Sequence, residues 1–419
     1  MKRELAFQLL QSILPDPPWN EDRLRQTLAD LRVLAEHKYN KYEMYQPARL
    51  FFENLYLFLL RFKEEHRSTA LEFVCRDLTF ISRDEFQQLA NILYYDRIRQ
   101  KQLDLASKNS GIPRHRVSRL VDSPEFQRIQ RASLYVALSD GARIDYFRRQ
   151  NLEINNEQVL AAYYVANEKV LDMRRDLRKA LSDPEAKFEC LFLLDDFFGS
   201  GKTLLREAVL VTVDVANVEV PKALEGKLSF DEDKRQLSWN YSGPVGDKER
   251  SALDALASSP ELRTAVDKIK ESCLKRETIL KGALQKMADT KLLDSVRDDA
   301  SVYLAPLMAT EYGIDRLTPL LSRLKPPLNA LAIIPAAVVP NKLRVLPGAG
   351  PVAELSELYY DPKIGDEHTS DVTFGYDGCG LPVVLHHNTP NNSLYFLWAR
   401  KWGSPLFARY ERHGRESQH

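Results

Sequence analysis

An apolar run that ends in two adjacent aspartates constrains the fold of this 419-residue chain more than any other feature. In CLFLLDDFFGSGKTLLRE (190–207), the run passes through the aspartates into a glycine-rich loop and then a helix-like pattern. Continuous apolar runs of this kind are typical of strands that a parallel sheet buries on both faces. The same order of strand, loop and helix begins at SLYVAL and at VYLAPLMAT, and ALAIIPAAVVP supplies another strand. The pattern predicts an α/β fold with a helix-covered parallel sheet.

The chain is long enough for more than one hydrophobic core, and its pattern changes along its length. We expect a helical N-terminal region, a first part of the core, a hairpin with a helical insertion, and a second part of the core with polar C-terminal loops. These regions cover residues 1–130, 131–221, 222–298 and 299–419. In the insertion, GKLSFDEDKRQLSWNY predicts the hairpin, and Ser259 with Pro260 marks the start of a helix.

Composition excludes several classes of protein. Lys and Arg (59) balance Asp and Glu (59), so the net charge gives no argument for a polyanionic partner. The four cysteines lack CxxC spacing, which fits neither a zinc site nor a disulfide framework and predicts a reducing cytoplasm. We expect neither a signal peptide nor a membrane span, because no apolar run approaches the roughly 20 residues that a bilayer requires.

One interval is locally basic. Residues 97–149 hold twelve Lys/Arg and five Asp/Glu, a net charge of +7. Within it, LASKNSGIPRHRVSRLVDS resembles a helix-turn-helix pattern, although the alanine-to-glycine spacing is one residue too long. Two interpretations stay open: phosphate contacts to a nucleic acid, or a solvated basic face.

The glycine-rich loop has two interpretations that involve phosphate, and a third in which it is only a strand-to-helix turn. A P-loop requires G-x-x-x-x-G-K-[ST], and Gly201-Lys202-Thr203 supplies its second half. The first glycine of that motif would be residue 196, which is Asp196, and its carboxylate would face the phosphates. The NTPase interpretation therefore conflicts with the acid pair, because a carboxylate at this position would repel the phosphates.

LFLLDDFFGSGKT matches the phosphoribosyl pyrophosphate (PRPP) signature and so resembles the type I phosphoribosyltransferases. The resemblance implies that Asp195 and Asp196 hold the ribose hydroxyls and a Mg²⁺–pyrophosphate complex. It also implies that a helix N-terminus in the loop seats the 5′-phosphate. The phosphate-binding candidates are Gly199, Ser200, Gly201, Lys202 and Thr203.

An upstream loop and a C-terminal stretch complete the candidate site. In ALSDGARIDYFRR the loop follows a strand, and the resemblance implies that it receives pyrophosphate through Ser139, Gly141, Ala142 and Arg143. The alternative is an ordinary capped turn. In LPVVLHHNTPNNSLYF, His387 is a candidate general base or electrostatic partner, and its neighbours are candidates for acceptor binding unless the segment is a simple turn. These neighbours are His386, Asn388, Asn391 and Asn392.

Four stretches together resemble a bacterial phosphoribosyltransferase-like family associated with conflict systems: SDGARIDYFRR, LLDDFFGSGKT, MATEYGIDRL and GYDGCGLPVVLHHNTPNNSLYFLW. Members of that family are encoded beside phage-defence components, including some retron reverse transcriptases. The resemblance covers most of residues 70–400. It implies a type I phosphoribosyltransferase-like core with an N-terminal helical domain and a helical insertion.

The expected function is a cytoplasmic, Mg²⁺-dependent effector that transfers or hydrolyses the ribosyl group of PRPP or a nucleotide. The resemblance implies partners such as a reverse transcriptase–nucleic acid complex or other defence proteins, and homo-oligomerisation stays open. Two alternatives remain: a non-catalytic sensor of ribose phosphates or docking module for nucleic acid or protein, and a P-loop NTPase.

Overall fold

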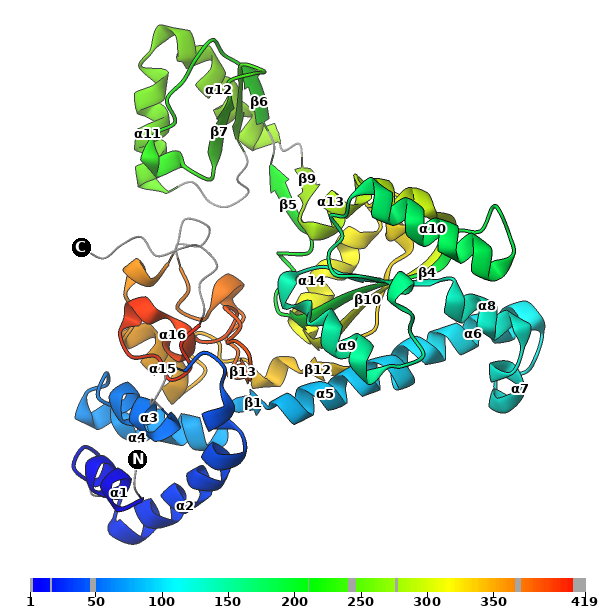
Figure 1. The fold of residues 1–419 in the computed structure, drawn as a ribbon. Coiled ribbons are helices and arrows are strands. Elements are labelled where there is room, and N and C mark those ends of the chain that lie inside the picture. The colour runs from blue at the N-terminus through cyan, green and yellow to red at the C-terminus, as the bar shows by residue number, and fades with distance from the viewer. Residues whose placement is uncertain are drawn as a thin grey trace.

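The structure, a computed structural model, describes residues 3–15, 17–45, 50–209, 211–239, 246–275, 278–365 and 371–409. Figure 1 shows three parts: a core lobe around a parallel sheet, a terminal lobe that contains both ends of the described chain, and an appended module. A long helical segment connects the terminal lobe to the core lobe. It consists of α5 (Arg83–Ile92), the π-helical turn η2 (Leu93–Ile98) and α6 (Arg99–Ser110).

The sheet of the core lobe is entirely parallel. Its strand order is β3-β2-β4-β10-β11, and β12 also pairs with β10. The strands are β2 (Ser133–Ala137), β3 (Val159–Leu160), β4 (Phe188–Phe198), β10 (Val296–Thr310), β11 (Ala332–Ile333) and β12 (Ala337–Val339). The predicted α/β class is confirmed, and strands form within each predicted run, although ALAIIPAAVVP forms two short strands, β11 and β12, instead of one.

Both faces of this sheet are buried, as continuous apolar strands require. On one face, Leu191 and Leu193 of β4 pack with side chains from α10 (Asn167–Leu181), α13 (Ala283–Ala288) and α14 (Glu311–Leu321). On the other face, Cys190, Phe192 and Leu194 pack with side chains from α5, α6, α8 (Pro124–Arg131) and α9 (Ile144–Gln150). Successive side chains of β4 thus alternate between the two cores.

The terminal lobe has its own apolar core, to which the N-terminal helices and the C-terminal residues both contribute. Its two-stranded parallel sheet pairs β1 (Thr79–Ile81) with β13 (Val383–Leu385). Phe51, Phe58 and Phe73 pack in the same cluster as Phe396 and Phe407. The helices are α1 (Arg3–Gln11), α2 (Glu21–His37), α3 (Phe51–Leu59), α4 (Glu64–Arg76), α15 (Pro351–Leu358) and α16 (Tyr395–Trp398).

The appended module leaves the core through two antiparallel strands and contains the predicted hairpin. β5 (Arg206–Val209) pairs with β9 (Thr278–Lys281), and the module's sheet has the order β6-β8-β7. The other elements are β6 (Val211–Asp214), β7 (Leu228–Asp231), β8 (Gln236–Trp239), α11 (Asp247–Ala257) and α12 (Pro260–Lys275). The helix predicted to begin at Ser259–Pro260 is α12, which begins at Pro260.

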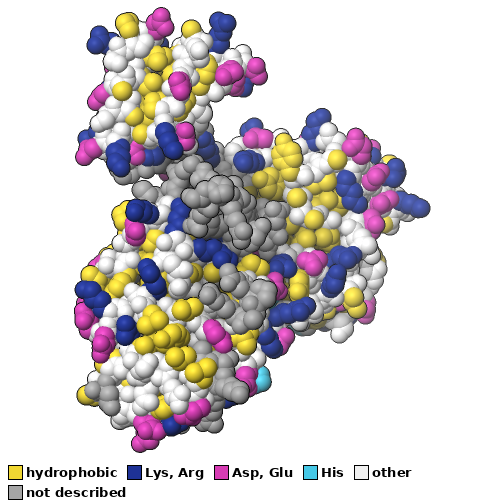
Figure 2. Space-filling model, turned by 60° about the vertical axis from the view of Figure 1, so that its left-hand side comes forward, with side chains coloured by type: hydrophobic (Ala, Val, Ile, Leu, Met, Phe, Trp, Pro, Cys, Tyr) yellow, Lys and Arg dark blue, Asp and Glu magenta, His cyan; other side chains and the backbone are white. Residues whose placement is uncertain are grey.

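The basic interval does not form a helix-turn-helix motif. The helix expected to follow the turn is α7 (Val117–Val121), which has only five residues. It ends at Val121, and the next helix, α8, begins at Pro124. Several arginines of the interval already pair with carboxylates, including Arg114 with Asp104 and Arg128 with Glu125. On the face drawn in Figure 2, side chains of both charges are mixed across the lobes. Within the described ranges, no helix has both the length and the apolar character to cross a membrane.

Candidate functional site

The acid pair lies within strand β4, beyond the point where the neighbouring strand β2 ends. Leu194 is opposite Ala137, the last residue of β2, and Asp195 is opposite Pro306 of β10. The neighbouring strand β2 therefore ends just before the acid pair. In open parallel sheets, ligands bind at the carboxyl ends of the strands, and the pair lies at that edge.

Asp195 is enclosed and hydrogen-bonded. Its side chain accepts a hydrogen bond from Ser139 Oγ (2.7 Å) and one from the backbone N–H of Asp196 (3.1 Å), and the residue is 8% exposed. Burial, followed by the negative charge of Asp196, raises the pKa of Asp195 to about 8. The Asp195 carboxyl group therefore keeps its proton to a higher pH than an exposed aspartate does.

Asp196 brings two distant segments together. Its Oδ2 lies 2.8 Å from Nε2 of His387, 191 positions along the chain. A Cβ added to Gly141 would lie 3.2 Å from the same oxygen, so the upstream loop passes directly beside the carboxylate. The structure therefore unites the predicted catalytic residues Asp195, Asp196 and His387 with Ser139 and Gly141.

The two histidines differ in their surroundings. Both rings lie edge-on to Phe86, with centroids 5.1 Å from its ring. Burial, followed by the charges of nearby cations, lowers the pKa of His386 to about 3, so this ring stays neutral. Within the described residues, Nδ1 of His386 and of His387 is buried without a hydrogen-bond partner. His387 contacts Asp196, whereas His386 lies 3.7 Å from a carboxylate oxygen of Glu43.

The upstream loop closes on itself. The backbone N–H of Ala142 donates to the carbonyl of Ser139 (3.1 Å), so this predicted phosphate donor is already used inside the turn. Arg143 has a left-handed backbone (φ 46°) and donates to Glu43 (2.9 Å), which belongs to the terminal lobe. Its guanidinium therefore pairs with a carboxylate across the two lobes.

The glycine-rich loop does not begin a helix, which corrects the prediction of a helix N-terminus. Beyond Thr203, whose side chain is exposed, the chain turns and enters β5, because Arg206 to Val209 pair with β9. Gly201 turns the chain with φ 74°. The loop consequently lacks a helix dipole, and phosphate binding would rest on its hydroxyl, its amine and nearby cations.

Two side chains of this loop contact one carboxylate. Asp377 accepts hydrogen bonds from Ser200 Oγ (2.6 Å) and Lys202 Nζ (2.8 Å). Nη1 of Arg316, on α14, lies 3.8 Å from Asp377 Oδ2. The predictions did not include Asp377, Arg316 or Glu43. The only signal for Asp377 in the sequence is an acid among glycines in GYDGCG.

The C-terminal asparagines lie at different distances from the loop. A Cβ at Gly199 would clash with the side chain of Asn392, which therefore packs against the loop. Asn392 donates to the carbonyl of Tyr376 (3.1 Å). The backbone carbonyl of Asn391 accepts from Tyr376, and the side chain of Asn388 accepts from the backbone of the next residue. Asn392 thus contacts the loop, whereas these bonds of Asn388 and Asn391 lie within the C-terminal segment.

The carboxylates of the acid pair are suitable ligands for a divalent cation, but two carboxylates alone do not complete its coordination. Among the described residues, no group of three or more His, Cys, Asp or Glu side chains could hold a metal. Asp195 and Asp196 are hard oxygen ligands of the kind Mg²⁺ takes, and Mg²⁺ is usually bound through one or two carboxylates plus substrate phosphates. Burial and the neighbouring Asp196 carboxylate raise the pKa of Asp195, and a cation bound between the two acids would oppose that shift.

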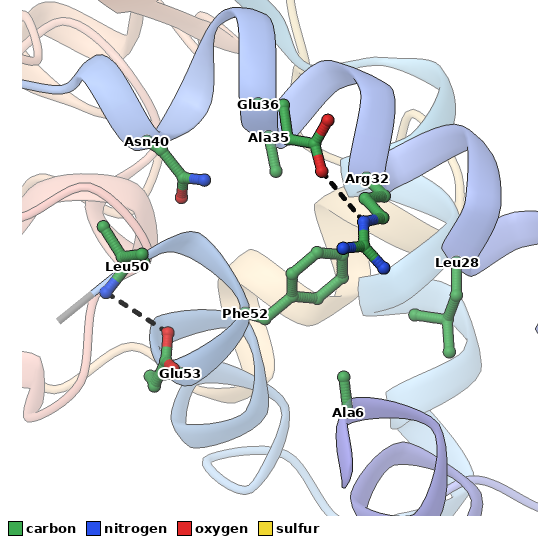
Figure 3. Close-up of a pocket in the computed structure, with 9 residues that line it drawn as sticks. All are labelled: Ala6, Leu28, Arg32, Ala35, Glu36, Asn40, Leu50, Phe52 and Glu53. Carbon is green, nitrogen blue, oxygen red and sulfur yellow. Dashed lines mark hydrogen bonds and ion pairs between the residues drawn. The ribbon is translucent and has the colours of Figure 1, made fainter. Parts of the chain in front are cut away.

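A small cavity of about 90 Å³ lies elsewhere, in the terminal lobe. Figure 3 shows its lining, which comes from α1, α2, α3 and the segments beside them and includes the ion pair of Arg32 with Glu36. It contains none of the predicted site residues, so it does not belong to the acidic site.

The fold places an acid pair and a glycine-rich loop on one side of a parallel α/β core. Residues 263–409 match the model of the PRTase-CE family, which confirms the resemblance to a phosphoribosyltransferase-like family. The match covers about a third of the chain and includes β10, α14 and His387, whereas the acid pair precedes it. Searches among curated proteins and among solved structures found no match.

Proposed function

We propose that this chain is a Mg²⁺-dependent enzyme that transfers or hydrolyses the ribosyl group of PRPP or of a nucleotide. The observation that carries the proposal is the meeting of Asp195, Asp196, Ser139 and His387 at the carboxyl edge of the sheet. Three segments far apart in the sequence converge there around two carboxylates, one of which has a strongly raised pKa. Perturbed carboxyl groups of this kind cluster at functional sites.

The residues have distinct roles in this proposal. Asp195 and Asp196 accept hydrogen bonds from the two ribose hydroxyls and fix the sugar beside the upstream loop. Mg²⁺, held by these carboxylates and by pyrophosphate oxygens, would neutralise charge on the leaving group. In this proposal Asp196 orients His387 through its Nε2, and His387 acts as a general base or as an electrostatic partner near the ribose.

A binding experiment tests the site. PRPP with Mg²⁺ is titrated calorimetrically into the wild-type chain and into the double variant Asp195→Asn/Asp196→Asn. We expect binding to the wild type and its loss in the variant, while Asp315→Asn, on the exposed face of α14, serves as a control that also removes carboxylate charge. Equal binding by the wild type and the double variant, or binding by neither, rejects the proposal. A mass-spectrometric survey of nucleotides incubated with PRPP and Mg²⁺ then identifies the acceptor.

The biological setting proposed for this activity is bacterial anti-phage defence, with the chain as an effector beside a reverse transcriptase–nucleic acid complex or other defence proteins. Support comes from the family resemblance in the four stretches given above. Expression with its genomic neighbours in phage-infected cells tests this setting. Protection that requires Asp196 is expected, and a lack of protection in every gene combination would exclude it.

A second candidate function is a non-catalytic ribose-phosphate sensor. It is favoured by one observation: Lys202 and Arg143, the cations of the two candidate anion loops, both pair with carboxylates of the protein. Retention of cellular activity by Asp196→Asn would select the sensor over the enzyme. The P-loop NTPase alternative is weakened because a strand follows Lys202-Thr203 where a P-loop has its helix.

A further inference from the structure

Asp377 contacts the candidate phosphate loop at the side chains that a phosphate would use. The carboxylate receives hydrogen bonds from Ser200 Oγ (2.6 Å) and Lys202 Nζ (2.8 Å). Arg316 Nη1 lies 3.8 Å from the same group. A hydroxyl, an ammonium and a guanidinium that converge on one anion are a recurring set of ligands for phosphate monoesters. The Asp377 carboxylate is the anion that this set binds in the structure.

The backbone holds Asp377 in this place. Tyr312 donates its hydroxyl hydrogen bond to the carbonyl of Asp377 (3.2 Å), and Arg344 donates to the carbonyls of Gly378 and Cys379 (2.9 Å each). Asp377 itself has a left-handed backbone (φ 57°). Aspartate is among the few non-glycine residues that adopt this conformation readily, so the backbone turn and the position of the carboxylate are compatible.

The contact connects the terminal lobe to the core lobe. Asp377 precedes β13 in the C-terminal segment, while Ser200 and Lys202 follow β4 of the core sheet. The side chain of Asp377 is 12% exposed and that of Lys202 is 35% exposed, so the pair is partly accessible to solvent. Rotation of the aspartate side chain would free the amine and the hydroxyl without moving the backbone.

We propose that Ser200, Lys202 and Arg316 form a seat for a phosphate monoester, and that Asp377 fills this seat until such a ligand displaces it. The inference rests on the proposed function for the identity of the loop, and it adds a cation from α14 and an internal competitor. Apparent affinity falls in proportion to the fraction of molecules whose seat is free. Asp377 therefore sets the phosphate concentration at which the site responds.

A second contact follows the same pattern. Glu43, also from the terminal lobe, accepts a hydrogen bond from Arg143 of the upstream loop (2.9 Å), and its backbone N–H donates to the carbonyl of His386 (2.8 Å). Carboxylates of the terminal lobe thus form hydrogen bonds with both the upstream loop, at Arg143, and the glycine-rich loop, at Ser200 and Lys202. The two contacts together describe a self-inhibited state that anionic ligands relieve.

Calorimetric titration with ribose 5-phosphate, without Mg²⁺ or pyrophosphate, tests the seat. We compare the full-length wild type with Asp377→Asn, which suits the left-handed backbone, keeps an acceptor for Ser200 and removes the competing charge. The expected result is a Kd lower by about ten-fold or more, because the ammonium of Lys202 no longer pairs with an internal carboxylate. Lys202→Ala in the same background should abolish the gain.

The matched control is Asp361→Asn, which removes one negative charge in the same C-terminal segment from a side chain that caps the turn η9 (Pro362–Ile364). It should leave the Kd unchanged. If circular dichroism shows Asp377→Asn unfolded, Asp377→Gly replaces it, because glycine also adopts the left-handed backbone.

Unchanged or weaker binding in a folded Asp377 variant overturns the inference. The result is distinguishable from failure of the proposed function. A chain that does not turn over PRPP can still bind ribose 5-phosphate more tightly after Asp377→Asn. Conversely, PRPP turnover with no effect of Asp377→Asn keeps the enzyme and removes the internal competitor.

Discussion

Replacement of Asp195 by asparagine is expected to stabilise the folded chain, by an amount that depends on pH. The folded-state pKa is raised to about 8, so the folded protein binds this proton more tightly than the unfolded chain, whose carboxyl titrates near about 4. Stability from this group is therefore complete below about pH 4 and falls as the pH rises towards 8. The amide of the Asp195→Asn variant would not titrate, and its oxygen can still accept from Ser139.

The magnitude follows from the size of the shift. Each pKa unit corresponds to about 1.4 kcal/mol, so the difference of roughly three units between pH 4 and pH 7 sets a ceiling of about 4 kcal/mol. Relaxation around a buried pair lowers this value. We expect the free energy of unfolding of Asp195→Asn to exceed that of the wild type by about 2 kcal/mol at pH 7. That gain corresponds to a rise of about 5 °C in the midpoint of thermal unfolding.

The assay is thermal unfolding in EDTA at pH 5, 6, 7 and 8, for the wild type, Asp195→Asn and the exposed control Asp315→Asn. The midpoint of thermal unfolding should be higher in Asp195→Asn than in the wild type, and this difference should grow from pH 5 to pH 8. The midpoint of the Asp315→Asn control should equal that of the wild type at each pH. Addition of Mg²⁺ should narrow the difference, because a cation offsets the charge that the substitution removes. A difference that is constant or shrinks with pH refutes the reasoning.

Three further predictions concern single residues. His387→Gln should lower ribosyl turnover by about 100-fold or more while ribose 5-phosphate binding changes little, and single-turnover kinetics beside equilibrium binding measure the two effects. Gly199→Ala should destabilise the fold by about 1–3 kcal/mol, because its methyl group clashes with Asn392, and Gly199→Ala/Asn392→Ala should recover part of the loss in urea unfolding. Leu193→Ala should cost about 2–5 kcal/mol in the same assay, because Leu193 is fully buried in the core sheet, and a cost below that of an exposed Leu152→Ala would contradict the assigned core.

Local sequence patterns were sufficient for the sheet and for the acid pair. The apolar runs of β2, β4 and β10 encode burial on both faces, and that burial is a property of each run by itself. Asp195 and Asp196 directly follow the apolar run of β4, so their place at the carboxyl edge follows from the strand. The likeness to phosphoribosyltransferases came from the same short stretches.

The continuation of the glycine-rich loop needed the tertiary structure. The residues after Thr203 have a helix-like pattern, yet they form β5, because β9 returns about 70 residues later and pairs with it. Hydrogen bonds to a distant strand outweigh a weak local preference. The helix N-terminus expected at the glycine-rich loop is absent for this reason.

What the sequence by itself determined is the chemistry available at the end of β4: two carboxylates, a turn of small residues and an amine. Only the tertiary structure decided which other side chains form hydrogen bonds or ion pairs with the residues of this site. Glu43 comes from the N-terminal region and Asp377 and His387 from the C-terminal region, and a shared apolar core in the terminal lobe brings these regions together beside the sheet. Of the three, only His387 was predicted as a site residue. Contacts between segments separated by a hundred residues or more depend on the packing of whole lobes, which no local pattern of side chains encodes.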